Sequence, residues 1–151
     1  MSTPQTGAVP AGPCAGELKP AEAWARLVGD PAALLVDVRS RIELALTGAP
    51  DLTGLAREPV VVEWMTLQGR NPGFLDELQG QLSERGAGPD TPLLFLCRSG
   101  GRSRMAAGEL TAVGFRACYN IAEGFEGALD AQGHRNSVDG WKARGLPWKQ
   151  T

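Results

Sequence analysis

Three uninterrupted apolar runs, each ending in polar residues, constrain the fold of this chain more than any other feature. They are ALLVDVR (33–39), PVVVEW (59–64) and PLLFLC (92–97), and ACYNI (117–121) forms a shorter fourth run. Continuous rather than alternating apolar residues are typical of strands covered on both faces within a parallel sheet. We therefore expect a parallel sheet buried between two other layers.

Amphipathic segments separate the apolar runs. Residues 19–30, 71–86 and 101–113 each combine a helical spacing of apolar residues with start and stop signals. Asn71 is expected to cap the second helix, and Met105 is expected to face the core from the third. Strands that alternate with helices at this spacing predict an α/β fold with helices on both faces of the sheet.

Length and composition indicate one soluble domain. The 151 residues suffice for a single core, which we assign to residues 16–151, and residues 1–15 lack charged side chains and are expected to form a flexible tail. A net charge of −2 gives no reason to expect nucleic acid as a partner. Because the N-terminal stretch has neither a basic region nor an apolar run, we expect no signal peptide, no membrane span and a cytoplasmic protein.

The three cysteines show no metal or disulfide pattern. Cys14, Cys97 and Cys118 form no CxxC pair, so they fit neither a zinc site nor a disulfide framework and are expected to be free thiols in a reducing compartment. Cys118 lies in an expected buried strand and should be inert. Whether Cys14 or Cys118 takes part in any chemistry stays open at this stage.

The loop CRSGGRS follows the third apolar run directly. Its cysteine, Cys97, stands at the carboxyl end of an expected central strand, where open parallel sheets bind ligands. The two glycines let successive N–H groups converge on one anion, and the two arginines add positive charge. This environment should stabilise a thiolate, so we predict that Cys97 is a nucleophile rather than a buried apolar residue.

The strand, the loop, the following helix and the upstream DVRSRIE segment together resemble the rhodanese family, especially its single-domain members. The similarity spans about residues 17–149 and includes GFEG (124–127) and GLPW (145–148). The loop signature matches without a gap at Cys97, Arg98, Ser99, Gly100, Gly101, Arg102 and Ser103, and a second signature matches from Asp37 to Arg39.

The resemblance implies a rhodanese-like sheet of five parallel strands, whose first, short edge strand would lie near residues 16–18. It implies a sulfurtransferase that moves sulfane sulfur from a donor such as thiosulfate to a thiol or cyanide through a persulfide on Cys97. No metal or organic cofactor is implied. The expected partners are these small molecules, with a sulfur-relay protein as a further candidate. Asp37 and Arg39 would support the loop, with Asp37 bonded to a loop arginine.

Other functions remain open alternatives. Cysteine phosphatases and arsenate reductases separate their cysteine and arginine by five residues, whereas four separate Cys97 from Arg102, and the smaller loop favours sulfur over phosphate. A non-catalytic rhodanese-fold binding or regulatory module is a second alternative. A Cys–His hydrolase would need His134, which we expect on an exposed loop. Residues 124–141 could shape the rim of the site or form a passive loop.

Overall fold

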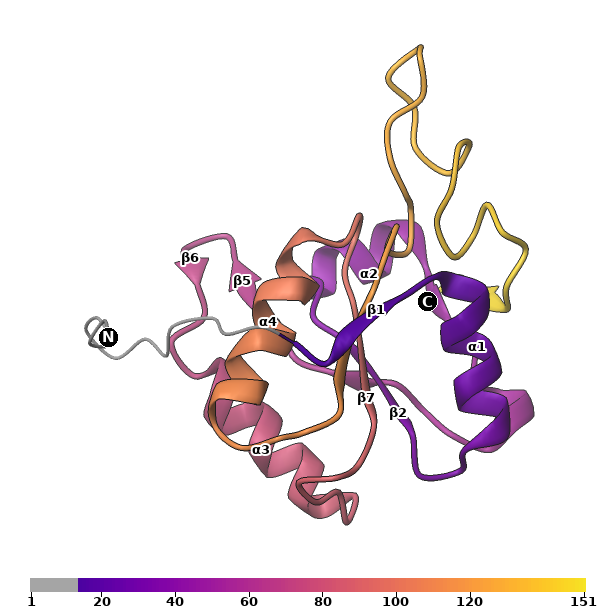
Figure 1. Cartoon of the computed structure of the whole chain (residues 1–151). Helices are drawn as coiled ribbons and strands as arrows, with labels where there is room; N and C mark the ends of the chain where they lie inside the picture. The colour runs from indigo at the N-terminus through magenta and orange to yellow at the C-terminus, as the bar shows by residue number, and fades with distance from the viewer. Residues whose placement is uncertain (1–13) are drawn as a thin grey trace.

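The computed structural model describes residues 14–151, and Figure 1 shows their course. The four helices within these residues are α1 (Pro20–Gly29), α2 (Arg41–Thr47), α3 (Phe74–Glu84) and α4 (Gly101–Ala112). The main strands are β1 (Gly16–Leu18), β2 (Leu34–Asp37), β4 (Val60–Val61), β7 (Leu93–Leu96) and β8 (Cys118–Ile121). Shorter elements are β3 (Ala49–Pro50), η1 (Thr53–Leu55), β5 (Met65–Thr66), β6 (Gly69–Arg70) and β9 (Trp148–Lys149).

The five main strands form one parallel sheet in the order β1-β8-β7-β2-β4. This confirms the predicted α/β class, the five parallel strands and the short edge strand at Gly16–Leu18. Pairing with β8 begins one residue earlier, where the Ala15 N–H donates to the carbonyl of Cys118 at 2.7 Å. β7 lies in the centre, so the loop that follows it opens at the middle of the sheet's carboxyl edge.

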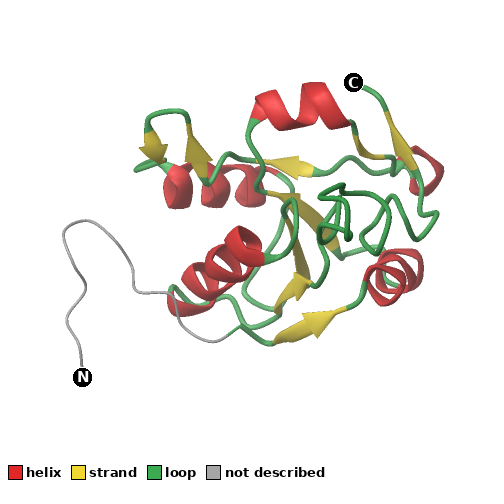
Figure 2. Cartoon of the chain, turned by 90° about the horizontal axis from the view of Figure 1, so that it is seen from above, coloured by secondary structure: helices red, strands yellow, loops and turns green. Residues whose placement is uncertain are grey.

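Successive residues of the central strand pack on opposite faces of the sheet. Leu93, Phe95 and Cys97 belong to a core with α3 and α4, whereas Leu94 and Leu96 belong to a core with α1 and the C-terminal segment. Figure 2 shows helices on both sides of the strands. Continuous apolar runs therefore fill two separate cores, which is the expectation from the sequence.

The sequence signals predicted most of the helices, but the observed helices begin or end at slightly different residues. α1 begins at Pro20, near the start of the segment 19–30 that was predicted as a helix. α3 begins at Phe74 with Gly73 as its N-cap, so the predicted cap at Asn71 is wrong. The Asn71 side chain instead accepts a hydrogen bond from the N–H of Gly73 and closes a turn before the helix. The short α2 was not predicted from the sequence. The run at 59–64 is mostly extended loop, with only Val60–Val61 paired in the sheet.

The buried face of α4 differs from the expected one. Ser103, Ala106, Ala107 and Leu110 are buried, whereas Met105 is 46% exposed, so its predicted core position is wrong. Since Ser103 turns inward to the loop cysteine, Met105, two residues further along and about 200° around the helix, must turn outward. The inner face of α4 is therefore built mainly from small residues, with the larger Leu110 near its C-terminal end.

The chain leaves β8 and projects from the carboxyl end of the sheet before returning to β9. This projecting loop, residues 128–139, is drawn in gold in Figure 1. Within residues 14–151, no helix is both long enough and apolar enough to cross a membrane.

Candidate functional site

The loop after β7 closes around the sulfur of Cys97. The N–H of Gly100 donates to the Cys97 Sγ at 3.2 Å, and the Ser103 Oγ lies at 3.2 Å from the same atom. Gly100 adopts φ +108°, a left-handed conformation that favours glycine, and α4 begins at the next residue. Backbone and hydroxyl donors and a helix N-terminus therefore surround a thiol whose residue is only 1% exposed.

A buried polar network fixes the Ser103 hydroxyl. Asn120 on β8 donates from its Nδ2 to the carbonyl of Gly100 at 3.1 Å and to Glu17 at 3.0 Å, so its Oδ1 faces Ser103 at 2.5 Å. Ser103 and Asn120 are fully buried. The hydroxyl has one proton, and its short contact with Asn120 Oδ1, which can only accept, takes that proton in the structure. Turning the proton to the Cys97 sulfur is favoured only when the sulfur is negatively charged.

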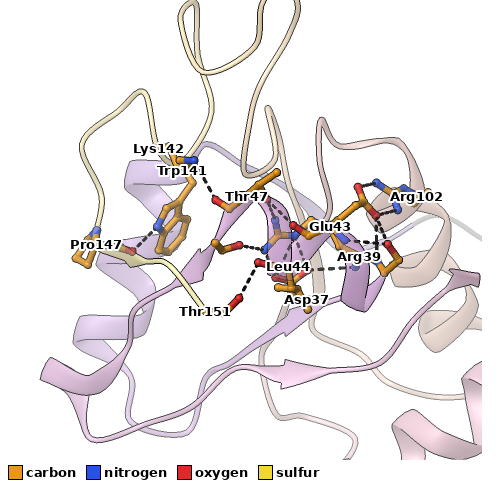
Figure 3. Close-up of polar contacts among 12 residues, drawn as sticks. Asp37, Arg39, Glu43, Leu44, Thr47, Arg102, Trp141, Lys142, Pro147 and Thr151 are labelled. Atoms are coloured by element: carbon orange, nitrogen blue, oxygen red, sulfur yellow. Dashed lines mark hydrogen bonds and ion pairs between the residues drawn. The ribbon is translucent and has the colours of Figure 1, made fainter.

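Asp37 and Arg39 form a buried ion pair beside the loop (Figure 3). The Arg39 Nη2 donates to Asp37 Oδ2 at 2.7 Å and its Nε donates to Asp37 Oδ1 at 3.0 Å, and both side chains are fully buried. Arg39 also donates to the Thr47 hydroxyl and the Gly48 carbonyl, and its guanidinium lies 4.2 Å from the centre of the Phe125 ring. The predicted bond from Asp37 to a loop arginine is wrong, because Arg39, two residues away, takes both of its oxygens.

The loop arginine pairs instead with a residue that the sequence did not suggest. Arg102 donates from Nη1 and Nη2 to the two oxygens of Glu43 on α2, at 2.7 Å and 2.8 Å, and each side chain is 23% exposed. Glu43 is held from its other side by Ser40, whose N–H and hydroxyl both donate to Oε1. The carboxylate that caps α2 therefore also fixes Arg102.

Glu43 stays ionised in the folded protein down to low pH. Burial opposes its charge, but the hydrogen bonds from Arg102 and Ser40 and the charge of Arg102 outweigh burial and lower its pKa from 4.5 to about 2. In return, the hydrogen bonds and charge of Glu43 raise the pKa of Arg102. The pair thus carries one positive and one negative charge throughout the neutral range.

The remaining loop residues face outward. Arg98 and Ser99 are exposed, and the Arg98 guanidinium has no acceptor among residues 14–151. The carbonyl of Arg98 accepts the N–H groups of Glu126 and Gly127, and that of Cys97 accepts the N–H of Phe125. These bonds hold the loop against residues 124–127, and they leave the Arg98 side chain available at the rim.

Gly124 makes this close packing possible. It adopts φ +68°, and a side-chain Cβ there would lie 2.5 Å from the backbone carbon and oxygen of Arg98. Only glycine fits this distance. The GFEG segment therefore serves the loop directly, which explains the role of one element of the family resemblance.

The other sequence candidates lie elsewhere. Burial raises the pKa of Cys118 to about 11, so its thiol stays protonated. Cys14 is half-buried against the core on the α4 side of the sheet, and His134 is exposed on the projecting loop. Residues 14–151 contain no group of three or more His, Cys, Asp or Glu side chains that could hold a metal ion.

A family profile, the STR4 middle domain, matches residues 16–151, which is nearly the whole described chain. The chain belongs to the STR4 middle domain family. This family is one of rhodanese-like domains.

The chain is similar to proteins from several organisms. The crystal structure of Rv0390 from M. tuberculosis is 48% identical, with a TM-score of 0.80, over 90% of this chain and 98% of that one. An uncharacterized protein of Rickettsia prowazekii is 37% identical over 85% of this chain and 92% of its own length. The chloroplastic protein THYLAKOID RHODANESE-LIKE of Oryza sativa is 33% identical over 88% of this chain but only 25% of its own length.

Sequence reasoning missed two residues of this rhodanese-like site. Glu43 could have been found, because Ser40-Arg-Ile-Glu43 is a capping-box pattern that marks a helix start and fixes a carboxylate next to the DVR segment. Asn120 had a weaker signal, a polar side chain within an otherwise apolar strand. Neither pattern reveals its partner in the loop, because Arg102 and Ser103 are distant in sequence.

Proposed function

We propose that this rhodanese-like domain is a sulfurtransferase that carries sulfane sulfur as a persulfide on Cys97. The single observation that supports it best is the Gly100 N–H, which donates to the Cys97 sulfur at 3.2 Å, with the Ser103 hydroxyl at the same distance from that atom. Such donors stabilise negative charge on sulfur, first as the attacking thiolate and then as the bound persulfide. The rhodanese-like family membership agrees with this chemistry.

The reaction would proceed in two halves. The Cys97 thiolate attacks the outer sulfur of the donor, the donor's S–S bond breaks, and the remainder of the donor leaves with the bonding electron pair. Thiosulfate would leave as sulfite, and a persulfide would leave as a thiolate. A thiol or cyanide acceptor then attacks the outer sulfur and restores the Cys97 thiolate. No oxidant or reductant is consumed.

The surrounding residues would support this chemistry without reacting. Asn120 fixes Ser103, Asp37 and Arg39 hold the base of the loop, and Gly124 lets residues 124–127 pack against it. Arg98 and Arg102 would attract the anionic donor. A reduced Cys97 is required, so a reducing compartment such as the cytoplasm suits the proposed reaction.

The proposal is tested by loading the purified protein with sulfur. After incubation with thiosulfate or with glutathione persulfide, intact-protein and peptide mass spectrometry should show the mass of one added sulfur on Cys97. Cyanide should then remove it as thiocyanate. Cys97→Ser should take up none, whereas the matched control Cys118→Ser should load normally, because the Cys118 thiol lies away from the loop.

Two results would overturn the proposal. Absence of the adduct with both donors and of thiocyanate would favour the non-catalytic binding module. Hydrolysis of an aryl phosphate that is lost in Cys97→Ser would favour a phosphatase. We expect no such hydrolysis, since the loop surrounds one sulfur with donors and has one residue fewer than a phosphatase loop.

A further inference from the structure

Most arginines around Cys97 are paired with carboxylates of the protein itself. Arg39 is paired with Asp37, Arg102 with Glu43, and Arg104 with Glu17 at 3.0 Å. Among the arginines of the loop and of α4's first turn, only Arg98 lacks an acceptor within the described residues. A site that bears two loop arginines in its sequence therefore offers an incoming anion little net positive charge.

Glu43 neutralises the positive charge of the loop arginine Arg102. Both of its oxygens contact Arg102, and Ser40 holds it in place from the helix cap. An anionic donor drawn to Arg102 must therefore approach the Glu43 carboxylate as well. At such short range in a partly buried site, repulsion from a carboxylate is comparable to the attraction of a guanidinium.

Sulfur donors differ in how strongly this balance affects them. Thiosulfate carries two negative charges, and the attacking Cys97 thiolate adds a third beside the one unpaired guanidinium. The form of a hydropersulfide that is attacked, R–S–SH, carries no charge on either sulfur, and the charged groups of a carrier such as glutathione lie several bonds from the reacting sulfur. The donors at Cys97, the Gly100 N–H and the Ser103 hydroxyl, contact the sulfur and leave the three sulfonate oxygens of thiosulfate to be held by other groups.

We propose that the Glu43–Arg102 pair makes this site selective for the hydropersulfide of a carrier thiol over thiosulfate, and that Glu43 is the specificity-determining residue. This inference rests on the proposed sulfurtransferase function and names its donor class. The Cys97 thiolate attacks the outer sulfur of R–S–SH, the carrier's S–S bond breaks, and R–S⁻ leaves and takes a proton from water. Cys97–S–SH is formed, and no oxidant is needed.

The test compares two donors and two variants. Second-order rates of sulfur loading on Cys97 are measured by rapid quench and mass spectrometry, with glutathione persulfide and with thiosulfate. Glu43→Gln removes the charge but keeps a helix-capping side chain, because glutamine also serves in a capping box. Asp90→Asn is the matched control: it removes a carboxylate that also binds an arginine, Arg116, at the opposite end of β7.

We expect the wild type to load from glutathione persulfide at least about tenfold faster than from thiosulfate, and E43Q to shift that ratio toward thiosulfate by about tenfold or more. The faster loading of E43Q from thiosulfate should appear mainly as saturation at a lower thiosulfate concentration. It should shrink at high salt, as expected for a charge effect. D90N should keep the wild-type ratio.

The outcomes separate this inference from the proposed function. A wild type that loads from thiosulfate as fast as from the persulfide overturns the inference but supports sulfur transfer, and this comparison needs no variant. An unchanged ratio in E43Q, or an equal shift in D90N, overturns the role of Glu43. Failure to load from either donor removes the proposed function and the inference together.

Discussion

Two arginine–carboxylate pairs stand side by side at the carboxyl edge of the sheet, and they differ in burial and in sequence separation. Asp37–Arg39 is fully buried and joins residues two positions apart, whereas Glu43–Arg102 is 23% exposed on each side and joins residues 59 positions apart. Both are bidentate. The two pairs have different tasks: the buried pair maintains the shape under the loop, and the partly exposed pair sets the charge beside it.

The surroundings of the two arginines explain this division. Arg39 satisfies a backbone carbonyl and a hydroxyl in addition to Asp37, and it packs on Phe125, which itself hydrogen-bonds to the Cys97 carbonyl. The Arg102 side chain has Glu43 alone as its hydrogen-bond partner within residues 14–151. Removing a partner from the first pair should therefore disturb the fold, and removing a partner from the second should change mainly the electrostatics.

The largest expected effect is the loss of stability in Asp37→Ala. It leaves the Arg39 charge buried without its counter-ion, which should lower the free energy of unfolding by about 3–5 kcal/mol. Glu43→Ala removes a pair that water still reaches, so it should cost less, about 1–3 kcal/mol including the lost helix cap. Urea unfolding followed by circular dichroism measures both, and equal costs would contradict the division.

Replacing each arginine by lysine should also cause different losses of stability, although this difference is smaller. Arg39→Lys loses the planar fork that reaches Asp37, Thr47 and Gly48 together, and we expect a loss of about 2 kcal/mol. Arg102→Lys retains a charge near Glu43 and should cost less than about 1 kcal/mol. Parallel thermal and urea unfolding of the two lysine variants tests the difference, which would disappear if both arginines were equally structural.

Lowering the pH should reduce the contribution of Glu43 to the stability of the protein. Because folding lowers the pKa of Glu43 to about 2 from 4.5, its contribution to stability is fully present above about pH 4.5 and is lost as the pH falls toward 2. Wild type should therefore be more stable than Glu43→Gln at about pH 5, and this difference in the free energy of unfolding should be smaller at about pH 3. If this difference in the free energy of unfolding increased on acidification, the charged pair would not be the source of the stability.

Salt should produce the smallest effect. Raising the salt from about 0.1 M to about 1 M shortens the screening length to about 3 Å, so the coupling between Glu43 and Arg102 should weaken by a few tenths of a kcal/mol. The coupling between Asp37 and Arg39 should change less, because water and ions do not reach it. Double-mutant cycles at the two salt concentrations measure both couplings.

Much of the fold could be predicted from local patterns. The apolar runs at 33–39 and 92–97 became β2 and β7, and Pro20 marks the start of α1. α2 was missed because seven residues are too few for a clear helical periodicity, although its capping box was present. Met105 was assigned to the core because its apolar character suggested burial, but the inward turn of Ser103 decided which side of α4 is covered.

The candidate site divides in the same way. The sequence placed Cys97 after a central strand, and its motif identified the two glycines, the arginines and Ser103 of the loop. It could not assign the partner of Arg102, because several carboxylates are compatible with a charged loop and their places in space depend on how the folded chain brings α2 to the loop. Asn120 likewise gained its role only when β8 was placed beside β7.

By itself the sequence predicted the parallel α/β architecture, the loop and its cysteine, because each leaves a local pattern in the chain: continuous apolar runs, helical spacing and a short motif. Only the tertiary structure decided that Asp37 serves Arg39, that Glu43 neutralises Arg102 and that Asn120 orients Ser103. Charge and hydrogen bonding act over a few ångströms in space, and residues 59 positions apart become neighbours only when the sheet and its helices have assembled.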